Sequence, residues 1–124
     1  MTDQTNQYVI LIVEPEWNPA DYSAEEFQAT GDQHRAFAEA VAAAGAKILD
    51  GNALQPSSQA VRITPASGDR EAVFTDGPFP ELKELVTGYY VIEADDVETA
   101  KRLAALCPTG GRLEMWPVFD TSNM

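Results

Sequence analysis

The chain has 124 residues, enough for one domain with a single hydrophobic core and too few for two. Its formal net charge of −12 comes from 20 acidic against 8 basic residues. Nucleic acids and anionic membranes attract clustered basic side chains, so this charge argues against direct binding to either. The single cysteine excludes an internal disulfide, and no apolar run reaches the length of a membrane span. These features favour a reducing, bacterial-type cytoplasmic location.

The domain is expected to occupy residues 8–119, with residues 120–124 as a C-terminal tail. Residues 1–7 are polar and lack the basic start and apolar centre of a secretory signal, so we expect them to be disordered or loosely held. Residues 8–13 form a continuous apolar run rich in β-branched side chains and ended by Glu14-Pro15. That pattern predicts a strand buried on both faces.

The first helix has signals at both ends. Ser23 and Glu26 have the spacing of a capping box, and Gly45 is the expected stop. Between them, Gly31 is expected to bend or split the helix, because glycine disfavours a helix interior. The helical period places one set of residues on a shared inward face: Phe27, Gly31, His34, Phe37, Ala38, Val41 and Ala44.

The middle of the chain has the pattern of extended structure. Residues 46–50 form a strand, and residues 60–64 and 71–75 form a hairpin around a turn-rich segment. The sequence Asp76-Gly77-Pro78-Phe79 predicts a tight turn, because glycine tolerates positive φ and proline fixes φ. Residues 88–94 form the next strand, in which Tyr89 and Tyr90 lie on opposite faces.

The chain ends with a helix, for which Asp95 is the expected N-cap with Glu98 at the capping-box position, and a strand over 112–118. The order β, α, β, hairpin, β, α, β predicts an α+β, ferredoxin-like βαββαβ fold with an inserted β-hairpin and both helices on one sheet face. Tyr89 and Trp116 make the other face too apolar for water. A homodimer through the sheet faces is therefore expected.

Four segments together resemble the DGPF-domain subgroup of the YCII-related family: residues 8–13, 34–45, 73–94 and 113–118. Pro80 and Leu82 depart from the usual pattern, which has Ala and Thr there. The resemblance implies a dimeric α+β barrel and an active site made from a helix histidine and a turn aspartate, His34 and Asp76 in this chain. The wider family includes a dehydrochlorinase of aromatic catabolism, related barrels include muconolactone isomerase, and many DGPF members accompany sigma factors.

His34 and Asp76 are the candidate catalytic residues. His34 is the only histidine, and it lies on the apolar helix face, where burial and a nearby carboxylate tune an imidazole pKa. A His–Asp pair can perform cofactor-free acid/base chemistry of the lyase or isomerase type on a small cyclic or aromatic substrate. The alternative is structural: a hydrogen-bonded core histidine and an aspartate that caps its own turn.

Phe79, Tyr89 and Lys83 are the candidate ligand-binding residues, the first two shaping a cavity and Lys83 binding an anionic group. Their structural alternatives are a core residue, a dimer-face residue and a solvated charge. One histidine and one cysteine predict no metal site, and Gly110-Gly111 lacks the lysine of a phosphate loop, so no cofactor is expected. The competing hypothesis is a non-catalytic interaction or small-ligand-binding module linked to sigma-factor regulation.

Overall fold

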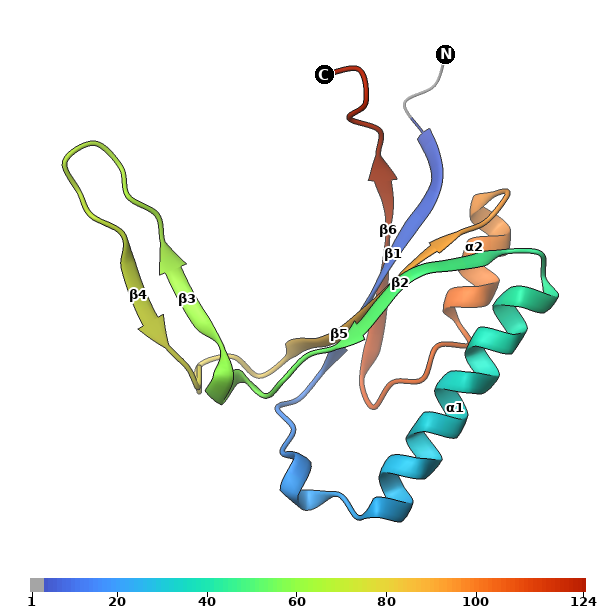
Figure 1. Ribbon diagram of the computed structural model, residues 1–124, viewed down its shortest axis with the longest axis horizontal. Coiled ribbons are helices and arrows are strands. Elements are labelled where there is room, and N and C mark those ends of the chain that lie inside the picture. Colours follow the sequence, from blue (N-terminus) through green and yellow to red (C-terminus); the bar gives the residue numbers. More distant parts are fainter. Residues whose placement is uncertain (1–3) are drawn as a thin grey trace.

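The computed structural model describes residues 4–124, so the first three residues of the expected loose N-terminal segment lie outside the described residues (Figure 1). Two short 3₁₀ turns, Pro19–Asp21 and Ser57–Gln59, accompany the main elements. The strands and helices are β1 (Gln4–Glu14), α1 (Ala24–Ala43), β2 (Lys47–Ala53), β3 (Val61–Thr64), β4 (Val73–Asp76), β5 (Leu85–Glu93), α2 (Val97–Ala104) and β6 (Arg112–Phe119).

Four of the strands form one antiparallel sheet in the order β2-β5-β1-β6. Both helices cover the same face of this sheet (Figure 1). Strands β3 and β4 pair only with each other and form a separate two-stranded sheet. Without that hairpin, the elements follow the βαββαβ order, and the predicted ferredoxin-like α+β fold with an inserted hairpin is confirmed.

The core lies between the helices and the sheet. Alternate residues of β1 point into it, beginning with Tyr8, because successive side chains of a strand face opposite sides. Phe37 and Val41 of α1 meet these residues from the helix side. The full set of buried core residues is Tyr8, Ile10, Ile12, Phe37, Val41, Ile92, Ala94, Ala100, Leu103, Ala104 and Cys107.

Helix α1 begins with the predicted capping box, in which Ser23 and Glu26 each accept a hydrogen bond from the other's backbone N–H. It ends before Gly45, whose φ of 76° is the left-handed conformation typical of a helix stop. The helix runs through Gly31 without a break, since twenty residues of helix absorb the cost of one glycine. Of the expected inward face, Phe27, Ala38 and Ala44 are exposed.

Several boundaries differ from the sequence prediction, most of them by three residues or fewer. Strand β1 begins at Gln4 rather than at residue 8, and β5 begins at Leu85 rather than at residue 88. The N-cap of α2 is Asp96 and not Asp95, because the Asp96 carboxylate accepts a hydrogen bond of 2.7 Å from the backbone N–H of Thr99. A cap must reach the third helical N–H, and Asp95 lies one residue too early for that.

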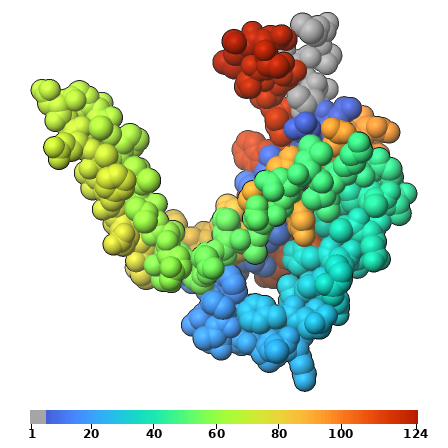
Figure 2. Space-filling view, in the orientation of Figure 1, coloured from blue at the N-terminus to red at the C-terminus, as the bar shows by residue number. Residues whose placement is uncertain are grey.

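The hairpin of β3 and β4, which we call the arm, projects away from the rest of the molecule on the side of the sheet opposite the helices (Figure 1). Every strand residue of the arm is exposed, including Ile63 at 56% and Phe74 at 65%. The sheet face without helices is also open, and Trp116 is 59% exposed there. Figure 2 shows an empty space between the arm and the body of the molecule.

Candidate functional site

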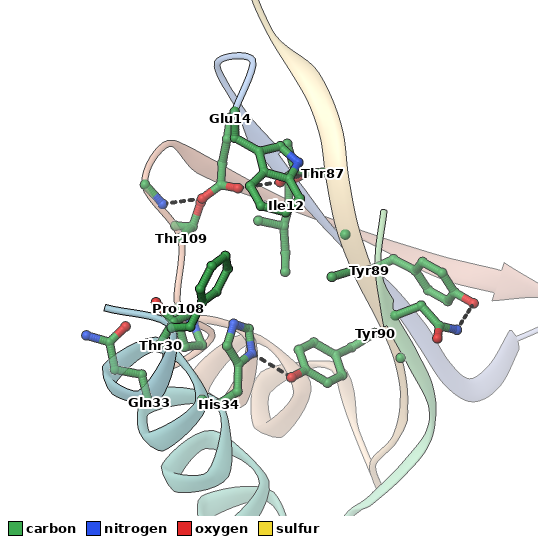
Figure 3. Close-up of a pocket in the computed structure, with 18 of the residues that line it drawn as sticks. Ile12, Glu14, Thr30, Gln33, His34, Thr87, Tyr89, Tyr90, Pro108 and Thr109 are labelled. Atoms are coloured by element: carbon green, nitrogen blue, oxygen red, sulfur yellow. Dashed lines mark hydrogen bonds between the residues drawn. The ribbon is translucent and has the colours of Figure 1, made fainter. Parts of the chain in front are cut away.

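A cavity of about 590 Å³ lies between the first half of α1, the sheet and the loop before β6 (Figure 3). This volume is in the range of small-molecule sites. Its lining residues come from elements far apart in the sequence: Ile12, Glu14, Trp17, Tyr22, Phe27, Thr30, Gly31, Gln33, His34, Gly51, Asn52, Ala53, Thr87, Gly88, Tyr89, Tyr90, Pro108, Thr109 and Gly110.

His34 reaches this cavity from α1 and is held by Tyr90 of β5. The His34 Nδ1 and the Tyr90 hydroxyl are 2.6 Å apart, and their rings lie 5.8 Å from each other. Phe37, one helical turn further on, also packs against Tyr90, and the two ring centroids are 4.8 Å apart. The second ring nitrogen of His34 is turned toward the cavity (Figure 3).

Burial controls the charge of this pair. Loss of solvent lowers the pKa of His34 below its ordinary value, and the negative charge of Glu14 opposes that change to a smaller extent. Burial also raises the pKa of Tyr90, with a further contribution from Cys107. At neutral pH the imidazole and the phenol are therefore both uncharged. In the tautomer whose Nδ1–H donates to the Tyr90 hydroxyl oxygen, the cavity-facing nitrogen has a free lone pair and can accept a proton.

Glu14 is the carboxylate of the cavity, and it is not one of the predicted site residues. Its Oε1 accepts a hydrogen bond from the Thr87 hydroxyl, and its Oε2 accepts one of 2.5 Å from the backbone N–H of Gly110. The loop that supplies Gly110 packs tightly on the end of β1, since a Cβ on Gly111 would lie 2.1 Å from the Val13 carbonyl oxygen. These contacts hold the carboxylate at one side of the cavity, with His34 at the other (Figure 3).

A sequence signal for Glu14 existed. Tyr8, Ile10 and Ile12 occupy alternate positions that face the core, and Glu14 continues this alternation. An acidic residue on the inward side of a buried strand is a candidate for a functional role. Tyr90 carried a weaker signal, because the strand alternation placed it opposite Tyr89 and on the core side.

Gly51 of β2 makes room for the Tyr90 ring. The two residues are partners across the β2–β5 pair. A Cβ added to Gly51 would lie 2.5 Å from the Tyr90 Cδ1 atom, which is closer than real Cβ contacts come. The position of the ring that holds His34 therefore depends on the absence of a side chain on the neighbouring strand.

Asp76, the second predicted catalytic residue, lies at the end of β4 and is exposed. It is not among the residues that line the His34 cavity. The turn that follows it packs against residues 57–60, because the backbone N–H of Gly77 donates a hydrogen bond of 2.9 Å to the Ala60 carbonyl. Among residues 4–124, the carboxylate that acts on the His34 pKa is Glu14.

The predicted ligand-binding residues occupy three different places. Phe79 lines a second cavity of about 470 Å³, and the Arg62 guanidinium lies 4.2 Å from its ring centroid. Lys83 is exposed and lines neither cavity. Tyr89 borders the His34 cavity, but its ring points away from it (Figure 3). The Tyr89 hydroxyl instead donates a hydrogen bond of 2.8 Å to Asp50 on the neighbouring strand.

Burial raises the pKa of the Cys107 thiol to about 12, so the sulfur is protonated and serves in packing. Among residues 4–124, no group of three or more His, Cys, Asp or Glu side chains is arranged to hold a metal ion. Within this same part of the chain, no helix is long and apolar enough to cross a membrane.

The family model for the YCII-related domain matches residues 7–120, which is nearly the whole chain. The protein therefore belongs to the YCII-related family. None of the curated proteins searched matches it.

Proposed function

We propose that this protein is a cofactor-free acid/base enzyme of the lyase or isomerase type, in the DGPF-domain subgroup and located in the cytoplasm. Its substrate is a small cyclic or aromatic molecule that binds in the His34 cavity. The observation that carries the proposal is a neutral histidine fixed by Tyr90 at 2.6 Å, with its other nitrogen turned toward a cavity of about 590 Å³. A general base works best when it is uncharged at the working pH and already oriented.

In this mechanism, His34 takes a proton from a substrate carbon beside a carbonyl, which leaves an enolate. In an isomerisation the electron pair shifts through a conjugated double bond, and His34 returns the proton at the far end of that bond. In an elimination the pair forms a double bond to the adjacent carbon and expels the leaving group, which receives the proton. For this role the resting proton of the imidazole lies on Nδ1, which donates it to the Tyr90 hydroxyl oxygen, and that hydrogen bond orients the ring. The negative charge of Glu14 stabilises the imidazolium that forms, because it favours the protonated form of His34.

Asp76 is the turn aspartate that the family resemblance pairs with His34, and it remains a candidate for the carboxylate partner. Its exposed position at the end of β4 suits a role in the turn, whereas Glu14 suits the role of the charge partner. The two carboxylates make different predictions, since only the true partner should change the acid/base behaviour of His34 when it is replaced by its amide.

The test is proton exchange in deuterated water, followed by NMR on a panel of small cyclic and aromatic carbonyl compounds. The wild type should catalyse incorporation of deuterium beside the carbonyl, and His34→Gln should abolish it. Tyr90→Phe should slow it by about 10-fold or more, as expected when an orienting hydrogen bond is lost. Equal exchange in the wild type and in His34→Gln would refute the proposal.

We also propose that a second copy of this chain covers the open sheet face, so that the active species is a homodimer. Trp116 pairs with Val9, whose neighbours Tyr8 and Ile10 point into the core, so Trp116 lies on the open face of the sheet. The arm projects on this side of the sheet (Figure 1), so a chain that covers the open face lies beside the arm. Two identical apolar faces cover each other in a two-fold dimer.

The same exposed surfaces support the alternative proposal, a non-catalytic interaction module that binds a sigma factor. Copurification distinguishes the two. A complex with a sigma factor that competes with self-association would favour the interaction module. A homodimer that stays intact and does not bind added sigma factor would favour the enzyme.

A further inference from the structure

The carboxylate of Glu14 has no cationic partner in the part of the chain that the structure describes. Both of its oxygens accept hydrogen bonds, but the donors are the neutral hydroxyl of Thr87 and the neutral backbone N–H of Gly110. None of the ion pairs of residues 4–124 includes Glu14. A partly buried charge without an opposite charge is unusual, since desolvation favours pairing.

The cavity contains no other charge at neutral pH. Its lining includes neither Lys nor Arg, and the remaining basic group, His34, is uncharged because burial lowers its pKa. Each carboxylate oxygen of Glu14 accepts one of these hydrogen bonds and has two lone pairs, so each can accept another. The cavity is therefore a negatively charged site with acceptor capacity left for a ligand.

Aromatic rings line the same cavity. The Trp17 and Tyr22 ring centroids lie 6.1 Å apart in an edge-to-face arrangement, and those of Tyr22 and Phe27 lie 5.4 Å apart. The faces of such rings attract cations as well as apolar groups. A lining of aromatic rings and one carboxylate matches a molecule that carries a positive charge on an apolar ring.

From these observations we infer that the cavity binds an organic cation, a small ring compound with an ammonium group, and that Glu14 is its counter-ion. The inference rests on the proposed function for the location of the site and adds the charge class of its ligand. The net charge of −12 acts in the same direction, because it attracts cations to the protein at long range. An anionic substrate, for which Lys83 was the predicted partner, is disfavoured by the same charges.

Three probes of one ring size and different charge test the inference: benzylamine, benzyl alcohol and benzoate at neutral pH. Dissociation constants are measured by NMR at His34, whose signals are unique because it is the only histidine. Benzylamine should bind about 10-fold more tightly than benzyl alcohol, since a charged hydrogen bond is worth roughly twice a neutral one. Benzoate should bind more weakly than both.

Glu14→Gln should remove the advantage of benzylamine over benzyl alcohol and leave the affinity for the alcohol within about 2-fold. Glu39→Gln, on the exposed side of α1, is the matched control, because it changes the net charge equally away from the cavity. It should leave the preference unchanged. The comparison of the three probes uses only the wild type, so it tests the inference even if Glu14→Gln does not fold.

Equal or tighter binding of benzoate, or no binding of benzylamine at millimolar concentration, would overturn the inference. A preference for the amine that survives in Glu14→Gln would overturn it as well. If the amine binds through Glu14 and His34→Gln leaves the deuterium exchange unchanged, the inference stands and the proposed chemistry fails. If the exchange depends on His34 but the cavity prefers neutral ligands, the proposed chemistry stands and the inference about the ligand charge fails.

Discussion

At the scale of single residues, the site depends on opposing effects on one imidazole. Burial among aromatic rings favours the neutral form of His34, and the charge of Glu14 favours the protonated form, with burial the stronger. The Tyr90 hydroxyl, whose own pKa is raised by burial, remains available as an uncharged hydrogen-bond partner. His34 is therefore held in a fixed orientation and is uncharged at neutral pH. When it accepts a proton, the carboxylate of Glu14 stabilises the imidazolium.

This arrangement predicts a pH dependence of stability. The pKa of folded His34 lies below its ordinary value of 6.5, so the unfolded chain binds a proton first as the pH falls. The free energy of unfolding gains a contribution from His34 that is present above pH 6.5 and is lost as the pH falls through the folded pKa.

Chemical denaturation between pH 5 and 8 measures this contribution as the difference between the wild type and His34→Gln, in which every carboxylate is retained. The stability of the wild type should fall relative to that of the variant as the pH decreases. A difference that is constant over this range, or that grows in the opposite direction, would show that His34 is not buried as described.

At the scale of secondary-structure elements, two glycines that line the cavity have opposite expected effects. In β2, a Cβ on Gly51 would collide with the Tyr90 ring at 2.5 Å. In α1, a Cβ on Gly31 would meet only the flexible end of Arg35, at 3.7 Å. A strand residue that makes room for a ring is costly to replace, and a helix glycine in open space is not.

We expect Gly51→Ala to lower the free energy of unfolding by about 1–3 kcal/mol, as overpacking does, and to shift the NMR signals of His34 as the Tyr90 ring moves. Gly31→Ala should raise the free energy of unfolding by about 1 kcal/mol, because alanine is the better helix former. Urea denaturation measures both. A neutral Gly51→Ala with unchanged His34 signals would contradict the described contact.

The local elements were predictable because their signals are local. Ser23, Glu26 and Gly45 marked the ends of α1, and turn residues marked the arm. The predicted N-cap of α2 was wrong by one residue. Asp95 and Asp96 have the same side chain, and which of them caps the helix depends on the residue at which the helix begins.

The site was predictable only in part. His34 was selected because it is a lone histidine on an apolar face, and the structure places it in the cavity. Glu14 accepts a hydrogen bond from Thr87 on the neighbouring strand β5, at the point where the β1–β5 register shifts between Ile12 and Val13. A shift in strand register is a long-range property that residue spacing does not reveal.

At the scale of the whole molecule, the exposed arm and the open sheet face are the surfaces that we expect a partner chain to cover. A two-stranded hairpin is marginally stable in water by itself, and the strand residues of the arm are all exposed. Ile63 and Phe74 of the arm and Trp116 of the sheet are each more than half exposed, and exposed apolar side chains on one side of a molecule indicate an interface. The proposed homodimer buries both, against repulsion between two chains that each carry a charge of −12.

Trp116→Glu should therefore convert the dimer to a monomer and speed amide hydrogen exchange in the arm, residues 61–76. Leu106→Glu is the control, because Leu106 is also exposed, at 56%, but follows α2 on the helix side. Light scattering gives the mass and exchange mass spectrometry gives the protection. A monomeric wild type, or an arm whose protection is the same in both variants, would contradict the proposed interface.

The most direct test of the central claim, that His34 is a buried neutral base with Glu14 as its charge partner, is an NMR titration of the His34 imidazole in the wild type, Glu14→Gln and Asp76→Asn. We predict a pKa below 6.5 in the wild type, a lower one in Glu14→Gln because a stabilising charge is lost, and no change in Asp76→Asn. A pKa at or above 6.5, or one that moves in Asp76→Asn and stays fixed in Glu14→Gln, would contradict the account.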